Sequence, residues 1–239
     1  MHNNSKKILF IALSLFVLNI SLYAQEGVSE PDPGLIGIES AQQSLREISI
    51  SKFEDAAFWY GKIGADDGII TVRDKVGNPS EKEPIEGEQQ AGINEVDENV
   101  LGVRVDFFRR GMVDFYVNPV RPLPIEGITK TVSLWVVGRN TRHTLKLIIK
   151  DHFGNYAELT MGDLNFSGWK KMVVAIPPNI VQRDYHYNDK MGIQIMGFKV
   201  ECDLEETYGR YYLYFDDLRA VSDLFAEQNR DADDVSDSW

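Results

Sequence analysis

The sequence predicts an all-β protein, an antiparallel jelly-roll β-sandwich with long surface loops. Three observations lead to this prediction: short runs of β-branched and aromatic residues recur along the chain, turn-forming residues separate them, and few stretches have a helical period. The stretch Thr131–Pro178 contains several of these runs, and its apolar face requires a second sheet to cover it. The sandwich is expected over residues 48–221.

Residues 1–24 have the pattern of a secretory signal peptide. Lys6 and Lys7 precede an apolar run over residues 8–20, and Ala24 is the small residue at which cleavage is expected. A transmembrane anchor is the alternative, but the run is short and no basic cluster follows it. No cysteine stands at the cleavage point to carry a lipid. The pattern therefore indicates an exported protein without a membrane anchor.

The chain is strongly acidic. Its formal net charge is −12, and removal of Lys6 and Lys7 with the signal peptide changes it to −14. Such a charge disfavours nucleic acid and anionic membrane surfaces, and it suits a basic partner or bound cations. The chain has one cysteine, Cys202, so it forms no intrachain disulfide. Cys202 is expected to share one strand face with Phe198 and Val200 as a small buried residue.

Three segments are expected to lie outside the strands. Residues 25–47 form a partly flexible leader, 73–99 a polar surface insert rich in acids, glycine and proline, and 222–239 an acidic tail. Segments of this composition bury too little apolar area to order themselves strongly.

The strands are expected where apolar residues alternate with polar ones or form short buried runs. Residues 118–124, which contain three prolines in seven positions, are expected to cross between strands as an extended segment. The expected strands are Gly68–Val72, Val100–Phe108, Val113–Val117, Thr131–Val137, Leu145–Lys150, Ala157–Thr160, Lys171–Ile176, Ile193–Cys202 and Tyr211–Phe215.

The aromatic residues are divided between core and surface. One group is expected to fill the core: Trp135, Phe153, Phe166 and Trp169. A second group of tyrosines is expected at the surface, because tyrosine buries its ring while its hydroxyl stays hydrated: Tyr185, Tyr187, Tyr208, Tyr211 and Tyr212. Exposed tyrosines suit sugar stacking or protein interfaces, and scattered surface residues remain the alternative.

The sequence offers no catalytic constellation. His143, His152 and His186 follow the signal peptide without a nucleophile elbow or a cysteine–histidine arrangement. Acidic residues are abundant, but a glycosidase pair needs a cleft that holds one acid protonated, and no pattern indicates one. We therefore expect that the protein is not an enzyme.

Several motifs carry a resemblance. Phe53-Glu-Asp, Ser133-Leu-Trp-Val-Val-Gly, Phe166-Ser-Gly-Trp-Lys and Tyr214-Phe-Asp-Asp-Leu-Arg resemble carbohydrate-binding-module jelly rolls of the galactose-binding type. With the signal peptide, the proline-rich segment and the acidic tail, the chain more closely resembles the flagellar filament outer layer protein A family. That family supplies sheath proteins of spirochaete periplasmic flagella.

The resemblance implies a structural role. It covers residues 48–221 and implies a periplasmic sheath subunit that coats the flagellin core and affects filament shape and motility. The implied partners are core flagellin, other sheath proteins and further copies along the filament. The alternative is a periplasmic carbohydrate-binding module.

Acidic residues near both ends of the sandwich predict a metal site. In jelly rolls the terminal strands pair, which brings Glu54 and Asp55 towards Asp216 and Asp217, and Ca²⁺ prefers such oxygen ligands. The resemblance to carbohydrate-binding modules also implies a structural Ca²⁺ there, with Glu54 and Asp216 as ligands; no other cofactor is expected. The alternative is that these carboxylates cap a turn or pair with Arg219.

The protein interface is expected on loops. Residues 118–128 and 182–190 supply proline and tyrosine, which lose little conformational freedom when they become ordered. The candidate contact residues are Pro122, Pro124, Tyr185 and Tyr187.

Overall fold

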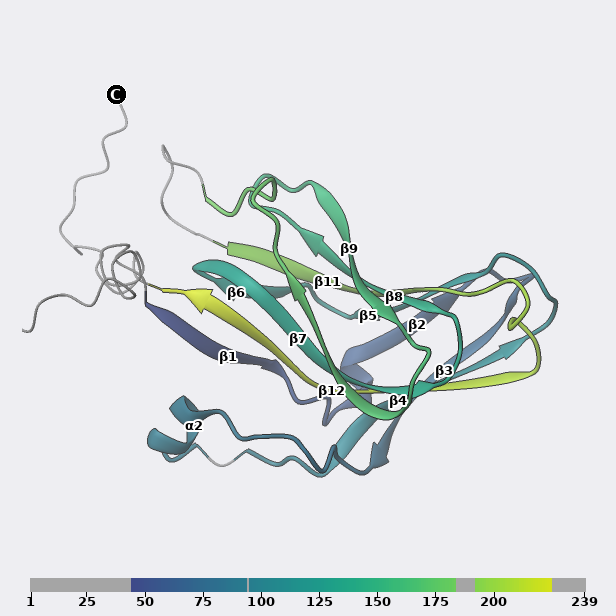
Figure 1. Ribbon diagram of the computed structural model, residues 1–239, viewed down its shortest axis with the longest axis horizontal. Coiled ribbons are helices and arrows are strands. Elements are labelled where there is room, and N and C mark those ends of the chain that lie inside the picture. Colours follow the sequence, from purple (N-terminus) through teal and green to yellow (C-terminus); the bar gives the residue numbers. More distant parts are fainter. Residues whose placement is uncertain (1–43, 94, 184–191, 225–239) are drawn as a thin grey trace, which may run out of the picture. The chain divides into compact units, whose positions relative to one another are not determined.

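The structure is a computed structural model that describes residues 44–93, 95–183 and 192–224. All of them belong to one compact unit, Gln43–Trp239. This unit is an antiparallel β-sandwich, as the sequence predicted (Figure 1). Its elements, in chain order, are β1 (Leu45–Ser51), the 3₁₀ turn η1 (Ala56–Phe58), β2 (Trp59–Ile63), β3 (Gly68–Val76), α2 (Glu86–Gln90), β4 (Asn99–Phe107), β5 (Asp114–Pro119), β6 (Leu123–Glu126), β7 (Ile128–Arg139), β8 (Thr144–Lys150), β9 (Tyr156–Asp163), β10 (Ser167–Ala175), β11 (Gly192–Glu201) and β12 (Arg210–Asp223).

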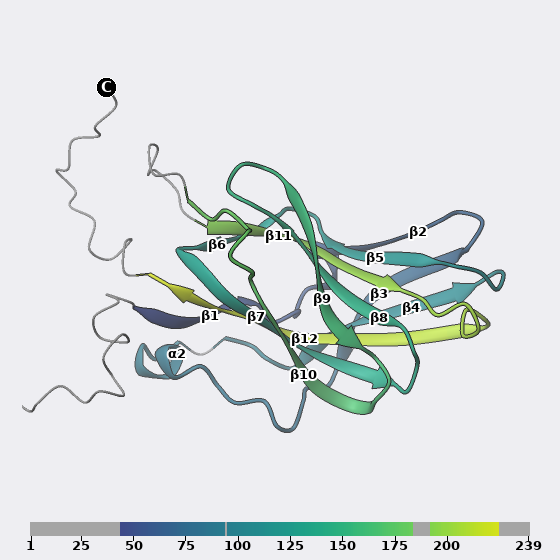
Figure 2. The same ribbon diagram turned by 45° about the horizontal axis from the view of Figure 1, so that its top comes forward.

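Two six-stranded sheets form the layers. Sheet A has the order β10-β7-β12-β4-β3, with β1 also paired to β12, and sheet B has the order β2-β5-β11-β8-β9, with β6 also paired to β11 (Figures 1 and 2). Among the described residues every strand pair is antiparallel. The terminal strands β1 and β12 pair, as expected of a jelly roll.

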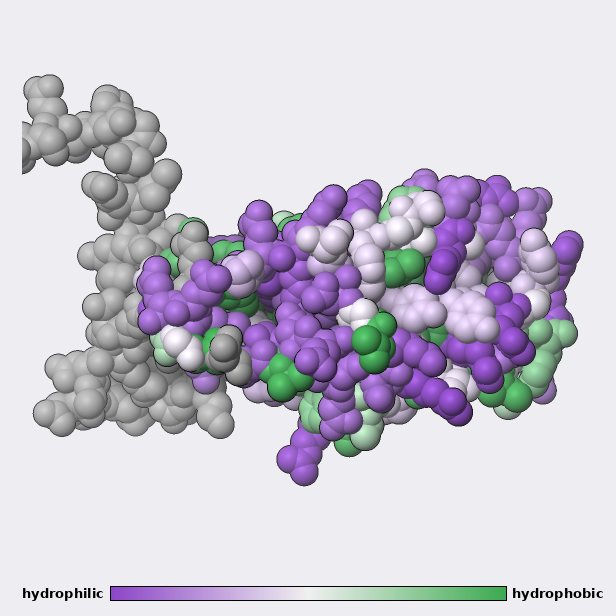
Figure 3. Space-filling view, turned by 90° about the horizontal axis from the view of Figure 1, so that it is seen from below, coloured by the Kyte–Doolittle hydropathy of each residue, from purple (hydrophilic) through white to green (hydrophobic). Residues whose placement is uncertain are grey.

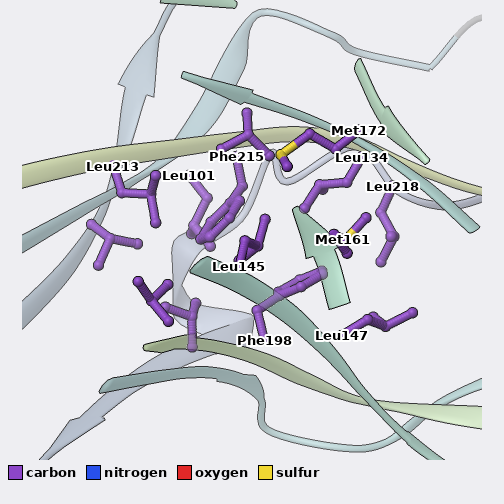
Figure 4. Close-up of a cluster of buried hydrophobic side chains, with 14 of the residues drawn as sticks. Leu101, Leu134, Leu145, Leu147, Met161, Met172, Phe198, Leu213, Phe215 and Leu218 are labelled. Atoms are coloured by element: carbon purple, nitrogen blue, oxygen red, sulfur yellow. The ribbon is translucent and has the colours of Figure 1, made fainter. Parts of the chain in front are cut away.

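The hydrophobic core lies between the sheets. On β4, Leu101, Val103 and Val105 are buried and alternate with residues on the outer face, because successive side chains of a strand point to opposite faces. Sheet B contributes Leu145 and Phe198 in the same way. Figure 4 shows leucine, methionine and phenylalanine side chains from both sheets meeting in this layer. Burial of this apolar surface is the main source of stability.

The strands between residues 131 and 178 do not form one continuous meander. β7 pairs with β10 in sheet A, whereas β8 pairs with β9 in sheet B. The chain therefore crosses between the layers after β7 and again before β10, and each pair covers the other across the core. β7 is buried on both faces from Val132 to Val137, as its continuous apolar run predicted.

The polar insert is shorter and better ordered than its composition indicated. β3 continues to Val76 and β4 begins at Asn99, so the connection spans residues 77–98 and includes α2. Ile85 is 5% exposed, and Lys82 forms two ion pairs, one with β12. One buried apolar side chain and a buried charge pair hold this connection against the sandwich, which a count of apolar residues does not reveal.

Three strands were not among those predicted: β1, β2 and β6. The sequence of β1 fits a strand or a short helix, and β2 was missed because its sequence, Trp-Tyr-Gly-Lys-Ile, is short and lacks β-branched residues before its end. β6 lies within the proline-rich segment and pairs with β11. Pro124 is tolerated there because β6 pairs on one side in the described sheet, so a missing N–H can face away from its partner.

The aromatic core also differs from the prediction. The rings that fill the centre are Phe53, Trp59, Phe115, Phe198 and Phe215. Phe153 is 60% exposed, so its assignment to the core was wrong, because it lies in the turn between β8 and β9. Tyr211 is 7% exposed, so its assignment to the surface was also wrong, because it occupies an inward position of β12.

Candidate functional site

Glu54 forms hydrogen bonds with the C-terminal end of the insert. It lies in the turn after β1, and its carboxylate accepts hydrogen bonds from the backbone N–H groups of Glu98 and Asn99, at 2.8 and 3.0 Å. The side-chain amide of Asn99 donates a third hydrogen bond at 3.0 Å. Asp55 caps η1 by accepting from the N–H of Ala57 at 2.8 Å. Both carboxylates therefore satisfy backbone donors at turns.

Asp216 lies on β12 beneath the insert and is fully buried. Lys82 Nζ lies 3.0 Å from Asp216 Oδ2 and 2.6 Å from Asp97 Oδ1. Burial raises the pKa of Asp216 to about 7, and the charge and hydrogen bond of Lys82 oppose that rise. The lysine ammonium thus joins two carboxylates that would otherwise repel each other.

The next residue, Asp217, pairs with Arg219. Arg219 Nε donates to Asp217 Oδ1 at 2.8 Å, and both side chains are almost fully buried. Asp217 has a φ of 53°, a left-handed conformation at a register shift of β12. This irregularity allows both Asp216 and Asp217 to be buried. Arg219 also donates to the backbone carbonyl of Glu83, so it is a second link from β12 to the insert.

These residues do not fit a Ca²⁺ site. Glu54 directs its oxygens at backbone donors, and the ammonium of Lys82 lies where a cation bound by Asp216 would lie. No group of three or more acidic, histidine or cysteine side chains suited to a metal occurs in the described part of the chain. Ca²⁺ needs six to eight oxygen ligands. The structure matches the alternative of turn caps and ion pairs, with Lys82 as a partner that the sequence did not identify.

His143, which precedes β8, and Cys202, which follows β11, also have structural roles. His143 is fully buried, and its Nδ1 accepts from the N–H of Asp203 at 3.0 Å. Burial lowers the pKa of His143, so the ring is neutral near pH 7. Burial also raises the pKa of the Cys202 thiol well above its usual range, which makes the thiol unreactive.

The two predicted interface loops leave the sandwich at the same edge. Pro122 and Pro124 are exposed beside β6. Tyr185 and Tyr187 lie outside the described residues, but the residues that flank them are anchored here. Gln182 exchanges hydrogen bonds with the backbone of Thr129 at 2.8 and 2.9 Å. Gly192 pairs with β6 and has a φ of 122°; a Cβ there would collide with the carbonyl oxygen of Ile125.

The outer face of sheet A carries a groove that the sequence did not predict. We call it the tyrosine groove; its volume is about 200 Å³, and it is lined by Thr71, Arg73, Lys75, Gly102, Val103, Arg104, Tyr212 and Tyr214. Figure 3 views the molecule from below the Figure 1 orientation and shows pale residues of intermediate hydropathy among strongly hydrophilic ones. The alternation of Tyr212 and Tyr214 with Tyr211 and Leu213 was the available signal, because it places two rings on the outer face.

The buried charges of the described residues thus pair within the domain, and two tyrosine rings and several basic side chains line a groove on its surface. These features define a β-sandwich whose buried carboxylates have structural roles. Within the described residues, no helix has the length and apolar character needed to cross a bilayer.

Comparison with known proteins identifies the family. The model of the flagellar filament outer layer protein FlaA family matches residues 29–230. A flagellar filament outer layer-like protein of Brachyspira hyodysenteriae is 34% identical over 197 residues, which cover 82% of this chain and 88% of that protein. The flagellar filament outer layer protein of Spirochaeta aurantia is 28% identical over 117 residues, covering 45% of this chain and 35% of that protein. The chain therefore belongs to the FlaA family and is a flagellar filament outer layer protein.

Solved structures with a similar chain course include carbohydrate-binding modules. A family 11 module from Clostridium thermocellum, in complex with a mixed-linked tetrasaccharide, has a TM-score of 0.42 and 11% identity over 75% of this chain and 97% of that chain. A module solved with β-1,4-galactotriose has a TM-score of 0.38 and 13% identity over 69% of this chain and 88% of that chain.

Proposed function

We propose that the protein is a non-catalytic subunit of the outer layer, which coats the flagellin core of a periplasmic flagellar filament. The observation that carries this proposal is the extent of the family match. It spans residues 29–230 and so includes every strand of the sandwich. The family match therefore extends over the whole described sandwich, which supports assigning the outer-layer role to this domain.

The sandwich edge beside β6 is the proposed contact with the core. Proline at positions 122 and 124 limits the conformational entropy that this segment loses on binding. The hydrogen bonds between Gln182 and Thr129 hold the start of the second loop at the same edge. Tyr185 and Tyr187 add aromatic side chains, which are enriched at protein interfaces. Two chain segments distant in sequence thus supply one recognition surface.

Export by residues 1–24 delivers the subunit to the periplasm, where the filament core is available. A filament is a helical polymer, so one face of each subunit must complement a different face of its neighbour or of the core. A coat that adds material unevenly around the core changes the stiffness and curvature of the filament. The proposed consequence is a change in filament shape and in motility.

Co-sedimentation with purified core filaments tests this proposal. The wild-type chain should pellet with core filaments, and the variant Pro122→Ser/Pro124→Ser/Tyr185→Ala/Tyr187→Ala should remain mostly in the supernatant. The matched control is Tyr156→Ala/Phe153→Ala, which removes two exposed rings at the β8–β9 turn. Equal pelleting of the edge variant and the wild type would contradict the proposed contact.

The alternative function is a periplasmic carbohydrate-binding module. The tyrosine groove favours it, because exposed tyrosine rings on a sheet face suit sugar stacking. A purified chain that binds a glycan tightly and never a flagellar protein would support this alternative over the coat.

A further inference from the structure

The tyrosine groove is basic although the chain is acidic. Within the described residues Arg73, Lys75 and Arg139 form no ion pair, and Arg139 lies over the ring of Tyr214 at 5.5 Å from its centroid. The formal net charge of the chain is −12. These unpaired cations lie together beside two tyrosine rings, and such a local group of positive charges favours an anionic ligand.

Neighbouring carboxylates do not cancel this charge. Asp106 is shared, since Arg210 Nε lies 2.7 Å from one of its oxygens and Arg104 Nε lies 3.0 Å from the other. One carboxylate thus faces two guanidinium groups. Asp74 is opposite Leu101 in the register of β3 and β4, which places it on the face turned away from the groove.

The strand register arranges the groove in two rows. Arg73, Gly102 and Tyr214 are neighbours across β3, β4 and β12, and Thr71, Arg104 and Tyr212 form the adjacent row. Gly102 keeps the centre of the first row open. A Cβ added there would lie 3.3 Å from the Tyr214 ring and 3.1 Å from the Lys75 side chain. An extended peptide can therefore lie between the cations of β3 and the tyrosines of β12.

The sequence contains a segment of matching charge. Residues 231–237 include Asp231, Asp233, Asp234 and Asp237 and no lysine or arginine. In an extended chain alternate side chains point the same way, so Asp231 and Asp233 share one side. We propose that the acidic segment 231–237 of a neighbouring copy binds in the tyrosine groove.

The path along β12 favours a neighbouring copy over the chain's own segment. Tyr214 lies nine residues before Asp223 on β12, which corresponds to about 30 Å of strand, and the chain's own segment would have to pass back along that length to reach the groove. The insert is bound across β12 between these points, through Lys82 on Asp216 and Arg219 on the carbonyl of Glu83. The groove and the segment are two different surfaces of one chain, so a head-to-tail contact between them can repeat from copy to copy.

Sedimentation of the full chain at low ionic strength tests this contact in the absence of flagellin. If the contact between copies is not found, the proposed coat function still stands, because it rests on binding to the core. The groove variant is Arg73→Glu/Lys75→Glu. The segment variant replaces Asp231, Asp233, Asp234 and Asp237 with Asn. The matched control Lys62→Glu/Arg121→Glu makes the same charge change at exposed positions outside the groove.

We expect the wild type and the control to self-associate, with an affinity that falls as salt is added. Each of the two variants alone should associate at least tenfold more weakly than the wild type. For the head-to-tail contact, the segment of the groove variant binds the groove of the segment variant, so the mixture should form a heterodimer.

Two results would overturn the proposal. One is a groove variant that self-associates as strongly as the wild type. The other is a wild-type chain that stays monomeric at low salt, in which case binding of an isolated peptide of residues 225–239 to the segment variant would show that each chain occupies its own groove.

Discussion

Lys82 and Asp216 connect the insert to the sandwich through an ion pair of 3.0 Å in which both side chains are buried. Lys82 comes from the connection between β3 and β4, and Asp216 comes from β12, 134 residues later in the chain. The pair fixes an acidic segment over the outer face of sheet A. It also supplies a positive charge from the protein itself, where the sequence indicated a metal ion.

Replacing Lys82 with Met should destabilise the domain by about 3–5 kcal/mol at pH 8, because it removes the charge that stabilises the buried Asp216 carboxylate. Urea denaturation measures this loss. The double variant Lys82→Met/Asp216→Asn should recover part of it, since the unpaired charge is removed. Lys75→Met is the control, because Lys75 is exposed and should matter little. A single variant as stable as the wild type would contradict a structural role for the pair.

Asp216 should also give the domain a distinctive pH dependence. Its pKa is raised from 3.8 to about 7 by burial, although Lys82 opposes the shift, and Asp97 and Asp217 add to it. Between these values the folded state keeps a proton that the unfolded chain releases, so this group's contribution to stability falls as pH rises from about 4 to about 7. The slope is at most about 1.4 kcal/mol per pH unit.

The free energy of unfolding of the wild type and of Asp216→Asn, measured at pH 5 and pH 7.5, isolates this contribution. The wild type should lose more stability than the variant over this interval. The neutral, buried His143 acts in the opposite direction, because its pKa is lowered, but it is present in both proteins and cancels in the comparison. Identical changes in both proteins would show that Asp216 does not titrate in this range.

Chelation should leave the melting temperature unchanged. A ligand that binds only the native state stabilises it by mass action, so removal of a structural Ca²⁺ would lower the melting temperature. Here Lys82 pairs with Asp216 Oδ2 in place of a cation, and backbone N–H groups satisfy Glu54. Thermal melts with excess chelator, followed by added Ca²⁺, measure the effect. A drop that Ca²⁺ reverses would establish a cation site despite the present geometry.

Phe215 should be a principal core residue. It is fully buried, and its ring centroid lies 5.2 Å from that of Phe198 in the opposite sheet. Phe215→Ala should cost about 3–5 kcal/mol of stability in denaturant titrations, because it leaves a cavity between the sheets. Phe153→Ala removes the same ring from a site that is 60% exposed and should change stability by about 0.5 kcal/mol or less. Similar losses for both variants would contradict this core.

The sandwich fold could be predicted from the sequence more completely than the sites on its surface. Alternation on β4 predicted which side chains face the core, because burial imposes a period of two on a strand. The partner of Asp216 was not predictable, because Lys82 lies in a polar segment whose composition resembles that of a mobile loop. The tyrosine groove depends on the register of β3, β4 and β12, and no local pattern encodes that register.

The filament itself provides the most direct test of the coat function. Electron cryotomography of cells that lack this protein, with a complemented strain as control, measures the thickness and coiling of the periplasmic filaments. We predict filaments that still assemble but are thinner or differently coiled, together with weakened motility. Filaments of normal thickness and shape in the deletion strain would contradict the proposal that this subunit coats the core.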